Sequence, residues 1–342
     1  MPPANSGHQF AIDTVRAQQG DFPPDARVEH RLLSGGLEAS HVSLTTIRFL
    51  DRRGKPRVLR TVLKQLDGWM VREASIYRNL VARYASELSP RLLAVEHPLP
   101  GRAYLCIEAV RRVSAWPWRD VDLSGRVLRD LATFHREARL APVAMSDWNF
   151  DAELAETAEH TATALDRCRK NPRLRKLTRG LPALTRLAHQ QAHLREQLFA
   201  EAPFGSGPIH GDVHSGNVLV RQRQSRPRPV FLDWARARLG SPLEDISSWL
   251  QSLGIHEREA RRRHDALLHD YLSEIGHDRR IGSSLRAAYW IASARNALGG
   301  ALLHHIRIAE DERRHERERL EAYRMARDWV RVIRRADAWS AG

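Results

Sequence analysis

The chain has 342 residues, of which 42% are hydrophobic and 28% charged, a composition typical of globular proteins and unlike disordered or fibrous ones. Its two cysteines, Cys106 and Cys168, are too few for a disulfide framework, which excludes a small secreted scaffold. The N-terminus has no apolar signal segment, and the most apolar long stretch, 285–306, contains two arginines and two histidines. We therefore expect a cytoplasmic protein without a membrane span.

The formal net charge of +14 raises the question of nucleic-acid binding. Lysine supplies only four of the 55 basic residues, so arginine enrichment runs through the whole chain. The densest arginine clusters, 261–263 and 313–314, lie among Glu and Asp residues, a pattern typical of a solvated, ion-paired helix face. We therefore expect no specific nucleic-acid partner.

The first 26 residues are polar and contain prolines, which predicts a loosely attached lead-in with room for one short helix. Residues 27–110 then predict strands around a single helix. Two segments rich in β-branched residues, 42–50 and 57–66, flank a turn and predict a hairpin.

A helix and two more strands are expected in the rest of this lobe. Apolar residues separated by three and four positions between 70 and 88 predict an amphipathic helix. Short strands are expected near 91–96 and 103–109. These elements complete a small, mostly β N-terminal lobe.

The remainder, 111–342, changes to a helical pattern and would form a large lobe. Apart from two short strands, helices are expected at 124–139, 151–166, 182–200 and from 241 to the end, with the strands at 217–220 and 230–232. A small mostly β lobe followed by a large mostly helical one predicts the α+β class.

The stretch from 208 to 235, PIHGDVHSGNVLVRQRQSRPRPVFLDWA, carries the clearest chemical signal. Asp212 and Asn217 lie five residues apart on a loop, and Asp233 follows an apolar strand. A carboxylate can accept the proton of an attacking hydroxyl, while an amide oxygen and a second carboxylate suit the hard ion Mg²⁺. The pattern therefore predicts phosphoryl transfer from a magnesium nucleotide.

His-Gly-Asp-x-His-x-x-Asn followed by Leu-Asp-Trp resembles the signature of the aminoglycoside phosphotransferase (choline kinase-like) family of small-molecule kinases. The resemblance implies a bilobal, protein-kinase-like fold and ATP, or else GTP, as phosphoryl donor. It implies that the lobe 27–110 binds the nucleotide and that the lobe 111–342 contains the catalytic loop and the acceptor site. It also implies Asp212 as catalytic base, Asn217 and Asp233 as magnesium ligands, and His210 as a residue that stabilises the loop.

Further segments follow in the order that this family has. Ser34-Gly35-Gly36 resembles the family's nucleotide loop, although it departs from the Gly-x-Gly-x-x-Gly of protein kinases. Lys64, retained in a chain that otherwise uses arginine, suits a specific phosphate contact. The resemblance pairs it with Glu73 on the predicted helix; the alternative is a solvated helix Glu.

Two more segments match. The strand that ends at Glu108 resembles the one that leads into the hinge between lobes, where backbone groups would bind adenine. The segment from Gly240 to Asp245 matches the family's Gly-x-Pro-x-x-Asp, in which the Asp braces the catalytic loop. Asp245 would then have a structural role.

The acceptor is less clearly encoded. The stretch 140–166 contains no Lys or Arg, and in relatives this region helps to form the acceptor pocket. Its candidate acceptor-site residues are Asp147, Trp148, Asp151, Glu153 and Glu156. An acidic wall with an aromatic residue suits a cationic or polyhydroxylated small molecule such as an amino sugar or aminoglycoside; the alternative is an acidic, solvated helix face.

Other acceptors of the family, such as macrolides, choline, homoserine or sugars, stay open, as does the oligomeric state. A non-catalytic or regulatory nucleotide-binding protein on the same fold is a rival, against which the intact Lys64, Asp212, Asn217 and Asp233 count. A protein kinase or nucleic-acid-associated kinase is another, against which His-Gly-Asp in place of His-Arg-Asp counts.

Overall fold

The computed structural model describes residues 6–33, 41–111, 113, 115–139, 148–201, 203–223, 226–277 and 280–340. The chain forms two compact units. Unit 1 comprises Met1–Trp116 and Asn217–Arg236, and unit 2 comprises Pro117–Gly216 and Ala237–Gly342. Among the predicted site residues, Ser34, Gly35, Gly36 and Asp147 lie outside the described residues.

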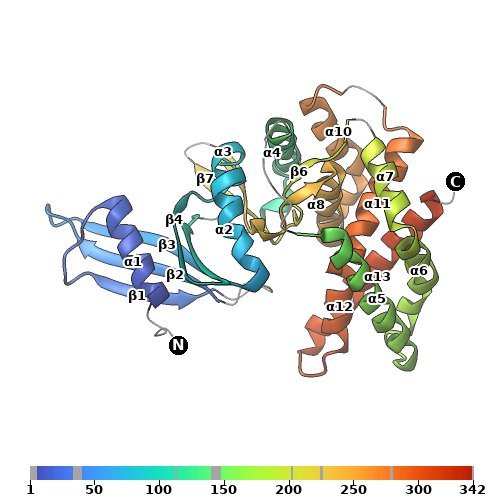
Figure 1. Cartoon of the computed structure of the whole chain (residues 1–342), viewed down its shortest axis with the longest axis horizontal. Helices are drawn as coiled ribbons and strands as arrows, with labels where there is room; N and C mark the ends of the chain where they lie inside the picture. Colours follow the sequence, from blue (N-terminus) through green and yellow to red (C-terminus); the bar gives the residue numbers. More distant parts are fainter. Residues whose placement is uncertain are drawn as a thin grey trace. The chain divides into compact units, whose positions relative to one another are not determined.

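Unit 1 is built on a five-stranded antiparallel sheet with the strand order β1-β2-β3-β5-β4 (Figure 1). The strands are β1 (Arg27–Leu32), β2 (His41–Leu50), β3 (Pro56–Asp67), β4 (Leu92–Leu99) and β5 (Arg102–Glu108). The predicted hairpin is confirmed, with Val42 opposite Lys64 and Leu50 opposite Pro56. Gly54 in its turn has a φ of 69°, which glycine adopts without a steric penalty.

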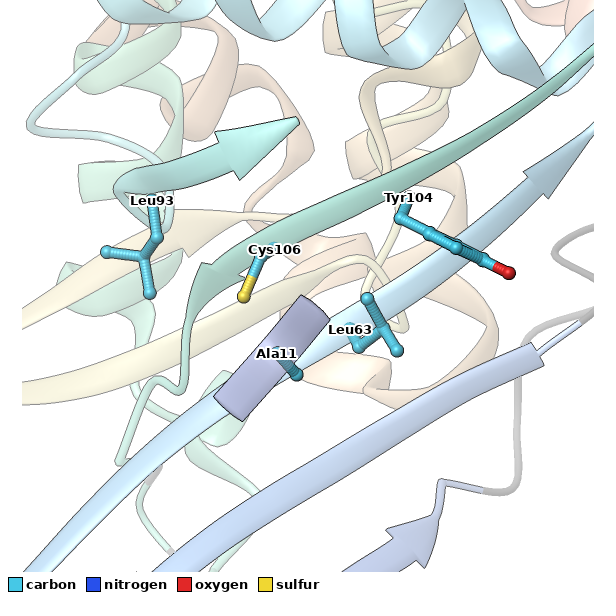
Figure 2. Packing of buried hydrophobic residues seen from close by; sticks show 5 residues of the cluster. All are labelled: Ala11, Leu63, Leu93, Tyr104 and Cys106. Carbon is cyan, nitrogen blue, oxygen red and sulfur yellow. The ribbon is translucent and has the colours of Figure 1, made fainter. Parts of the chain in front are cut away.

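The two faces of this sheet receive different side chains of β3, because consecutive residues of a strand point in opposite directions. Leu63 belongs to a buried cluster with helix α1 (Ser6–Gln19). The cluster members are Ala11, Leu63, Leu93, Tyr104 and Cys106 (Figure 2). Lys64, the next residue, points to the opposite face, where it meets a helix that follows β3.

The predicted loose lead-in is wrong. Helix α1 packs on the sheet, with Ala11 and Val15 fully buried, and the Ser6 hydroxyl lies 2.9 Å from the Tyr104 hydroxyl. The buried stripe consists of small residues spaced by four positions, so a mostly polar composition hid it. The one short helix for which this segment had room is therefore present, but it is docked on the sheet and not loosely attached.

The helix predicted between 70 and 88 is present but not uniform. It consists of η1 (Gly68–Val71), α2 (Arg72–Ile76), η2 (Tyr77–Val81) and α3 (Ala82–Tyr84). The middle segment is a π-helical turn, which widens the helix by one residue per turn. Leu80 and Val81 are both buried there.

A two-stranded ribbon from the centre of the chain completes unit 1. Strands β7 (Val218–Arg223) and β8 (Arg226–Phe231) pair antiparallel, with Val218 opposite Phe231. The ribbon is tied to the rest of unit 1 by backbone hydrogen bonds from Val113 N to Val220 O (3.1 Å) and from Phe231 N to Leu88 O (2.7 Å). The short turn η6 (Trp234–Arg236) follows.

Unit 2 is mostly helical and includes a small ribbon of β6 (Gly207–Ile209) and β9 (Arg238–Gly240). Its helical elements are η3 (Pro117–Arg119), α4 (Val121–Ala138), α5 (Phe150–Arg167), η4 (Cys168–Lys170), η5 (Arg175–Gly180), α6 (Leu181–His189), α7 (Gln191–Ala200), α8 (Pro242–His256), α9 (Arg258–Arg262), α10 (His264–Glu274), α11 (Ser283–Asn296), η7 (Ala297–Ala301), α12 (Leu302–Glu310) and α13 (Glu316–Ser340).

Polar side chains fix the starts of three of these helices. The Asp120 carboxylate accepts the N–H of Leu123 at the start of α4, and the Asn149 side chain accepts that of Ala152 at the start of α5. Ser241 and Glu244 form a capping box at the start of α8. These caps explain why the helices begin close to the predicted positions.

The single long helix expected over 182–200 is wrong, because the chain forms two helices that break at Gln190. This residue has φ −98° and ψ 8°, outside the helical region, and ends α6 while beginning α7. Its N–H is shared between the carbonyls of Arg186 and Leu187, as is common at helix ends.

The predicted α+β class is confirmed by a mostly β unit 1 and a mostly helical unit 2. Among the described helices, none is both long enough and apolar enough to cross a membrane.

Candidate active site

Three charged residues from distant parts of the chain meet in unit 1. The Lys64 Nζ lies 2.7 Å from Glu73 Oε1 on α2 and 3.0 Å from Asp233 Oδ1 after β8. The side chains of Lys64 and Glu73 are 8% and 0% exposed, whereas that of Asp233 is 34% exposed. The buried pair therefore holds an ammonium and a carboxylate at a place where only Asp233 is substantially open to a ligand.

Electrostatics keep Lys64 charged at this buried position. Burial lowers the pKa of Lys64, but the nearby carboxylates of Glu73 and Asp233 outweigh this effect and raise the pKa above its usual value. Burial raises the pKa of Glu73, and the ammonium of Lys64 opposes that shift. A charged lysine held in this way can act as a fixed point charge for an anionic ligand.

Asp233 has an unusual backbone. Its φ of 61° makes it the only non-glycine residue with positive φ in the part of the chain that the structure describes. Such a conformation costs energy and is found where the surrounding structure holds it, often at functional sites. Here Trp234 N donates to Glu73 Oε1 (3.2 Å), and the Arg72 guanidinium donates to the Ala235 carbonyl. Helix α2 thus holds the loop that presents the carboxylate.

The β7–β8 ribbon explains why Asn217 accompanies Asp233. Asn217 precedes β7 and Asp233 follows β8, so antiparallel pairing brings both to the same end of the ribbon. Leu232 N donates to the Asn217 carbonyl (2.8 Å), which joins the two segments directly. The side chains offer an amide oxygen and a carboxylate, and this donor set fits a magnesium ion better than a softer metal.

Glu108, at the end of β5, is bound within unit 1. Its carboxylate accepts from Arg221 Nη2 of β7 (2.9 Å) and from Arg91 N (3.2 Å). Its own backbone N–H donates to the Arg91 carbonyl (2.9 Å). This side chain therefore ties β5 to the ribbon.

The segment around Asp212 lies in unit 2, after β6. Asp245, in the first turn of α8, accepts the backbone N–H groups of His210 and Gly211, both at 2.8 Å. Gly211 has a φ of 81°, which places it in the left-handed region that favours glycine. Asp245 thus fixes the backbone of the two residues that precede Asp212.

The Asp245 carboxylate is itself held by His135 of α4. His135 Nε2 lies 3.0 Å from Asp245 Oδ2, and His135 Nδ1 lies 2.9 Å from the Tyr271 hydroxyl. Although burial raises the pKa of Asp245, the bond to His135 and the N–H groups of the loop more than offset it and lower the pKa below the usual value. The Asp245 carboxylate is therefore ionised at neutral pH.

Arg238 binds a backbone carbonyl of the same loop. The sequence alone did not predict Arg238 as a residue of the site. Its Nη1 donates to the Gly211 carbonyl (3.2 Å), and its guanidinium pairs with Glu244 and lies 3.7 Å from the Phe150 ring centroid. The side chains of Arg238 and Glu244 are both buried. The sequence offers no signal that distinguishes Arg238 from the other arginines.

Asp212 has two histidine neighbours in its own loop. Its backbone N–H donates to His210 Nδ1 (3.3 Å), so His210 supports the loop, and His214 lies beside its carboxylate. His214 Nε2 lies 3.8 Å from Asp212 Oδ2, and both side chains are more than a third exposed. His214 Nδ1 accepts the N–H of Gly216 (3.0 Å), so a neutral ring carries its proton on Nε2, the nitrogen that faces Asp212. The Asp212 carboxylate is thus accessible to a small molecule.

Of the predicted acceptor residues that the structure describes, Trp148 precedes α5, Asp151 and Glu153 lie in its first turn, and Glu156 lies one turn later. Asp151 pairs with Arg295 (2.8 Å) and Arg195 (3.2 Å), and Glu153 accepts from Trp148 Nε1 (2.6 Å). Glu156 is exposed. Two of the predicted carboxylates therefore have side-chain partners: Asp151 is ion-paired and Glu153 is hydrogen-bonded.

Residues 34–282 match the family model described as the phosphotransferase enzyme family. The chain belongs to this family. It is therefore a small-molecule phosphotransferase with a hydroxyl acceptor, and membership implies a nucleotide as donor. The match includes both loops described above, those of Asp212 and Asp233. No protein of curated function matches the sequence.

Solved structures share the fold across the whole length of the chain. A choline kinase from Cryptosporidium parvum matches with a TM-score of 0.60 and 12% identity, over 96% of each chain. A spectinomycin phosphotransferase matches with a TM-score of 0.58 and 12% identity, over 97% of this chain and 98% of that one. An amicoumacin kinase matches with a TM-score of 0.59 and 16% identity, over 96% and 93%. The predicted protein-kinase-like fold is confirmed.

Proposed function

We propose that the chain transfers the terminal phosphoryl group of Mg·ATP or Mg·GTP to a hydroxyl of a small cationic or polyhydroxylated molecule. The observation that carries this proposal is the cluster in unit 1, where Glu73 holds the buried Lys64 beside an accessible Asp233 with left-handed backbone. The spectinomycin phosphotransferase structure contains ADP and spectinomycin, and the amicoumacin kinase structure contains AMP-PNP and Ca²⁺. Both support a nucleotide as donor.

Residues of unit 1 would bind the nucleotide phosphates. The ammonium of Lys64 would contact phosphate oxygens, while Asn217 and Asp233 would hold magnesium through their side-chain oxygens. When bound, magnesium neutralises charge on the phosphate oxygens during transfer. Glu73 would keep Lys64 in place, since the pair is buried and in direct contact.

Asp212 would act as general base. The acceptor hydroxyl oxygen bonds to the terminal phosphorus, the bond from that phosphorus to the bridging oxygen breaks, and the nucleoside diphosphate leaves. The hydroxyl proton passes to the Asp212 carboxylate. Asp245 and Arg238 would position this base, because they bind the N–H and carbonyl groups of the residues just before it.

The proposed acceptor class is inferred from the composition of residues 140–166, which contain no Lys or Arg. Glu156 is exposed on α5, and Asp147 and Trp148 belong to the same stretch. Since Asp151 is paired with two arginines, it would contribute less attraction to a cation than an unpaired carboxylate. Choline and spectinomycin, for which two of the structural neighbours are named, belong in any test panel.

A coupled assay of nucleoside diphosphate release tests the proposal. ATP and GTP are each offered with Mg²⁺ and a panel of amino sugars, aminoglycosides, spectinomycin, macrolides, choline, homoserine and simple sugars. We expect release that requires both Mg²⁺ and one acceptor class, and that stops on addition of EDTA. The opposite result is a rate of diphosphate release that no acceptor of the panel raises above the rate without acceptor. Together with a normal thermal shift on Mg·ATP binding, it would instead support a non-catalytic nucleotide-binding protein.

A further inference from the structure

Unit 2 contains a cavity of about 440 Å³ that none of the proposed catalytic residues lines. It lies among α8, α9, α10, α11 and α13, and its volume is within the usual range of small-molecule sites. Gln251 and Gly254 of α8 line it. Ser252, which is rotated by about 100° around the helix, instead accepts the N–H of Ser215 in the Asp212 loop (3.1 Å). The cavity and the proposed active site thus use different faces of α8.

The charges around this cavity are unbalanced. Five arginines and two aspartates line it, Arg261, Arg262, Arg286, Arg331 and Arg335 against Asp265 and Asp328. Asp265 pairs with Arg286 (2.9 Å), and Asp328 pairs with Arg331 (2.5 Å) and Arg261 (3.6 Å). The lining therefore carries an excess of positive charge, which favours an anionic ligand.

Arg335 is the guanidinium best placed to bind an anion. It has no ion pair with any carboxylate among the described residues, and its side chain is exposed. Its Cζ lies 4.5 Å from the centroid of the Trp290 ring, so a cation–π contact holds it at the cavity. An arginine that is held by an aromatic ring and not by a carboxylate keeps its hydrogen-bond donors available for a ligand.

Three large aromatic side chains also line the cavity, Tyr289, Trp290 and Trp329. Trp329 is only 6% exposed, yet its buried Nε1 has no hydrogen-bond partner within the described part of the chain. Because this ring is packed in place, Trp329 forms a fixed part of the aromatic wall of the cavity.

Tyr289 is held in place by two neighbours. Its hydroxyl accepts from Gln251 Nε2 (3.0 Å) and lies 2.6 Å from His264 Nε2. Because Tyr289 is also buried, its ring forms a preorganised wall of the cavity. A preorganised wall lowers the entropic cost of ligand binding.

We propose that this cavity is a second ligand site, which binds a small planar organic anion against the aromatic wall formed by α11 and α13, beside the guanidinium of Arg335. The flat face of the ligand suits the Trp290 ring, and its carboxylate or phosphate suits the unbalanced arginines. This site is separate from the proposed transfer reaction and does not depend on it.

Isothermal titration calorimetry of the full chain at low ionic strength tests the proposal. The probes are 2-naphthoate, the uncharged 2-naphthamide, and inorganic phosphate, which has no ring. We expect saturable binding of 2-naphthoate at one site with a dissociation constant below about 1 mM, and at least about tenfold weaker binding of the other two. Absence of saturable 2-naphthoate binding, or equal binding of the amide, would overturn the proposal.

Two neighbouring exposed arginines give matched variants. Arg335→Gln removes the guanidinium at the cavity, whereas Arg334→Gln removes an exposed one that does not line it. We expect Arg335→Gln to weaken 2-naphthoate binding about fivefold or more and Arg334→Gln to leave it unchanged, with both variants melting like the parent chain. Equal affinities of the two variants, or displacement of 2-naphthoate by Mg·ATP, would contradict a separate site at Arg335.

Discussion

At the scale of single residues, replacing Lys64 by arginine tests whether this side chain contacts phosphate or only forms a structural ion pair. A guanidinium preserves charge but is wider and planar, so it does not fit between Glu73 and Asp233 at 2.6 and 3.0 Å. We expect Lys64→Arg to raise KM for ATP or lower turnover by at least about tenfold. The measurement is steady-state kinetics with ATP as the varied substrate.

Lys55 provides the matched control, because it lies exposed in the turn between β2 and β3. Lys55→Arg should leave both constants unchanged. If Lys64→Arg behaves in the same way, Lys64 does not contact the nucleotide.

A second residue-scale prediction concerns acid stability. Burial and the nearby His304, His256 and His214 lower the pKa of His305 to about 4, and its Nδ1 has no partner among the described residues. In the unfolded chain the His305 ring is protonated below a pH of about 6.5, whereas in the folded chain it is protonated only near pH 4. The contribution of the neutral, buried ring to the unfolding free energy is therefore complete above a pH of about 6.5 and is lost as the pH falls towards 4.

Chemical denaturation between pH 7 and 4 measures this effect. We expect His305→Gln to reduce the acid-dependent loss of unfolding free energy by about 1–3 kcal/mol. His160→Gln, at an exposed position on α5, should leave the pH dependence as it is. Parallel curves for the parent chain and His305→Gln would show that His305 does not titrate in this range.

At the scale of elements, helix α1 is part of the core of unit 1. Ala11→Asp would place a charge against Leu63 and Cys106, and we expect it to lower the unfolding free energy by about 3 kcal/mol or more. Ala17→Asp changes an exposed residue of the same helix and should cost no more than about 0.5 kcal/mol. Denaturant unfolding that gives the two variants equal stability would mean that α1 is not docked in solution.

Periodicity predicted most elements but not their interruptions. The hairpin of β2 and β3 follows from β-branched residues on both sides of a turn, and α4 follows from its apolar stripe. The break at Gln190 and the π-helical turn at 77–81 depend on backbone geometry and tertiary packing, which no spacing of apolar residues records. The docking of helix α1 on the sheet was missed because its buried residues are small.

At the scale of the whole molecule, the densest arginine clusters are ion-paired. The predicted alternation at 261–263 and 313–314 is confirmed: these arginines pair with Asp328, Glu259, Asp311 and Glu318. Such pairs reduce the charge available to a polyanion, which is consistent with the expectation of no specific nucleic-acid partner.

The family motifs identified chemistry in both units and part of its support, namely Glu73 and Asp245, but not every supporting residue. Spacing singled out Asp212 and Asp233, because loop and strand signals surround them. The support from Arg238 and His135 could not be predicted, since each arrives from a distant element and only the fold brings it to the loop. The acceptor residues stay a prediction, because exposed carboxylates on a helix look alike whether or not they bind a ligand.

The central claim is that Asp212 accepts the proton of the acceptor hydroxyl. Asp212→Asn keeps the shape of the side chain and removes its basicity, so the variant should fold normally and show the parent thermal shift with Mg·ATP. With the acceptor identified by the diphosphate-release panel, we expect turnover to fall by at least about a hundredfold. Turnover within about twofold of the parent chain, at an unchanged thermal shift, would contradict this assignment.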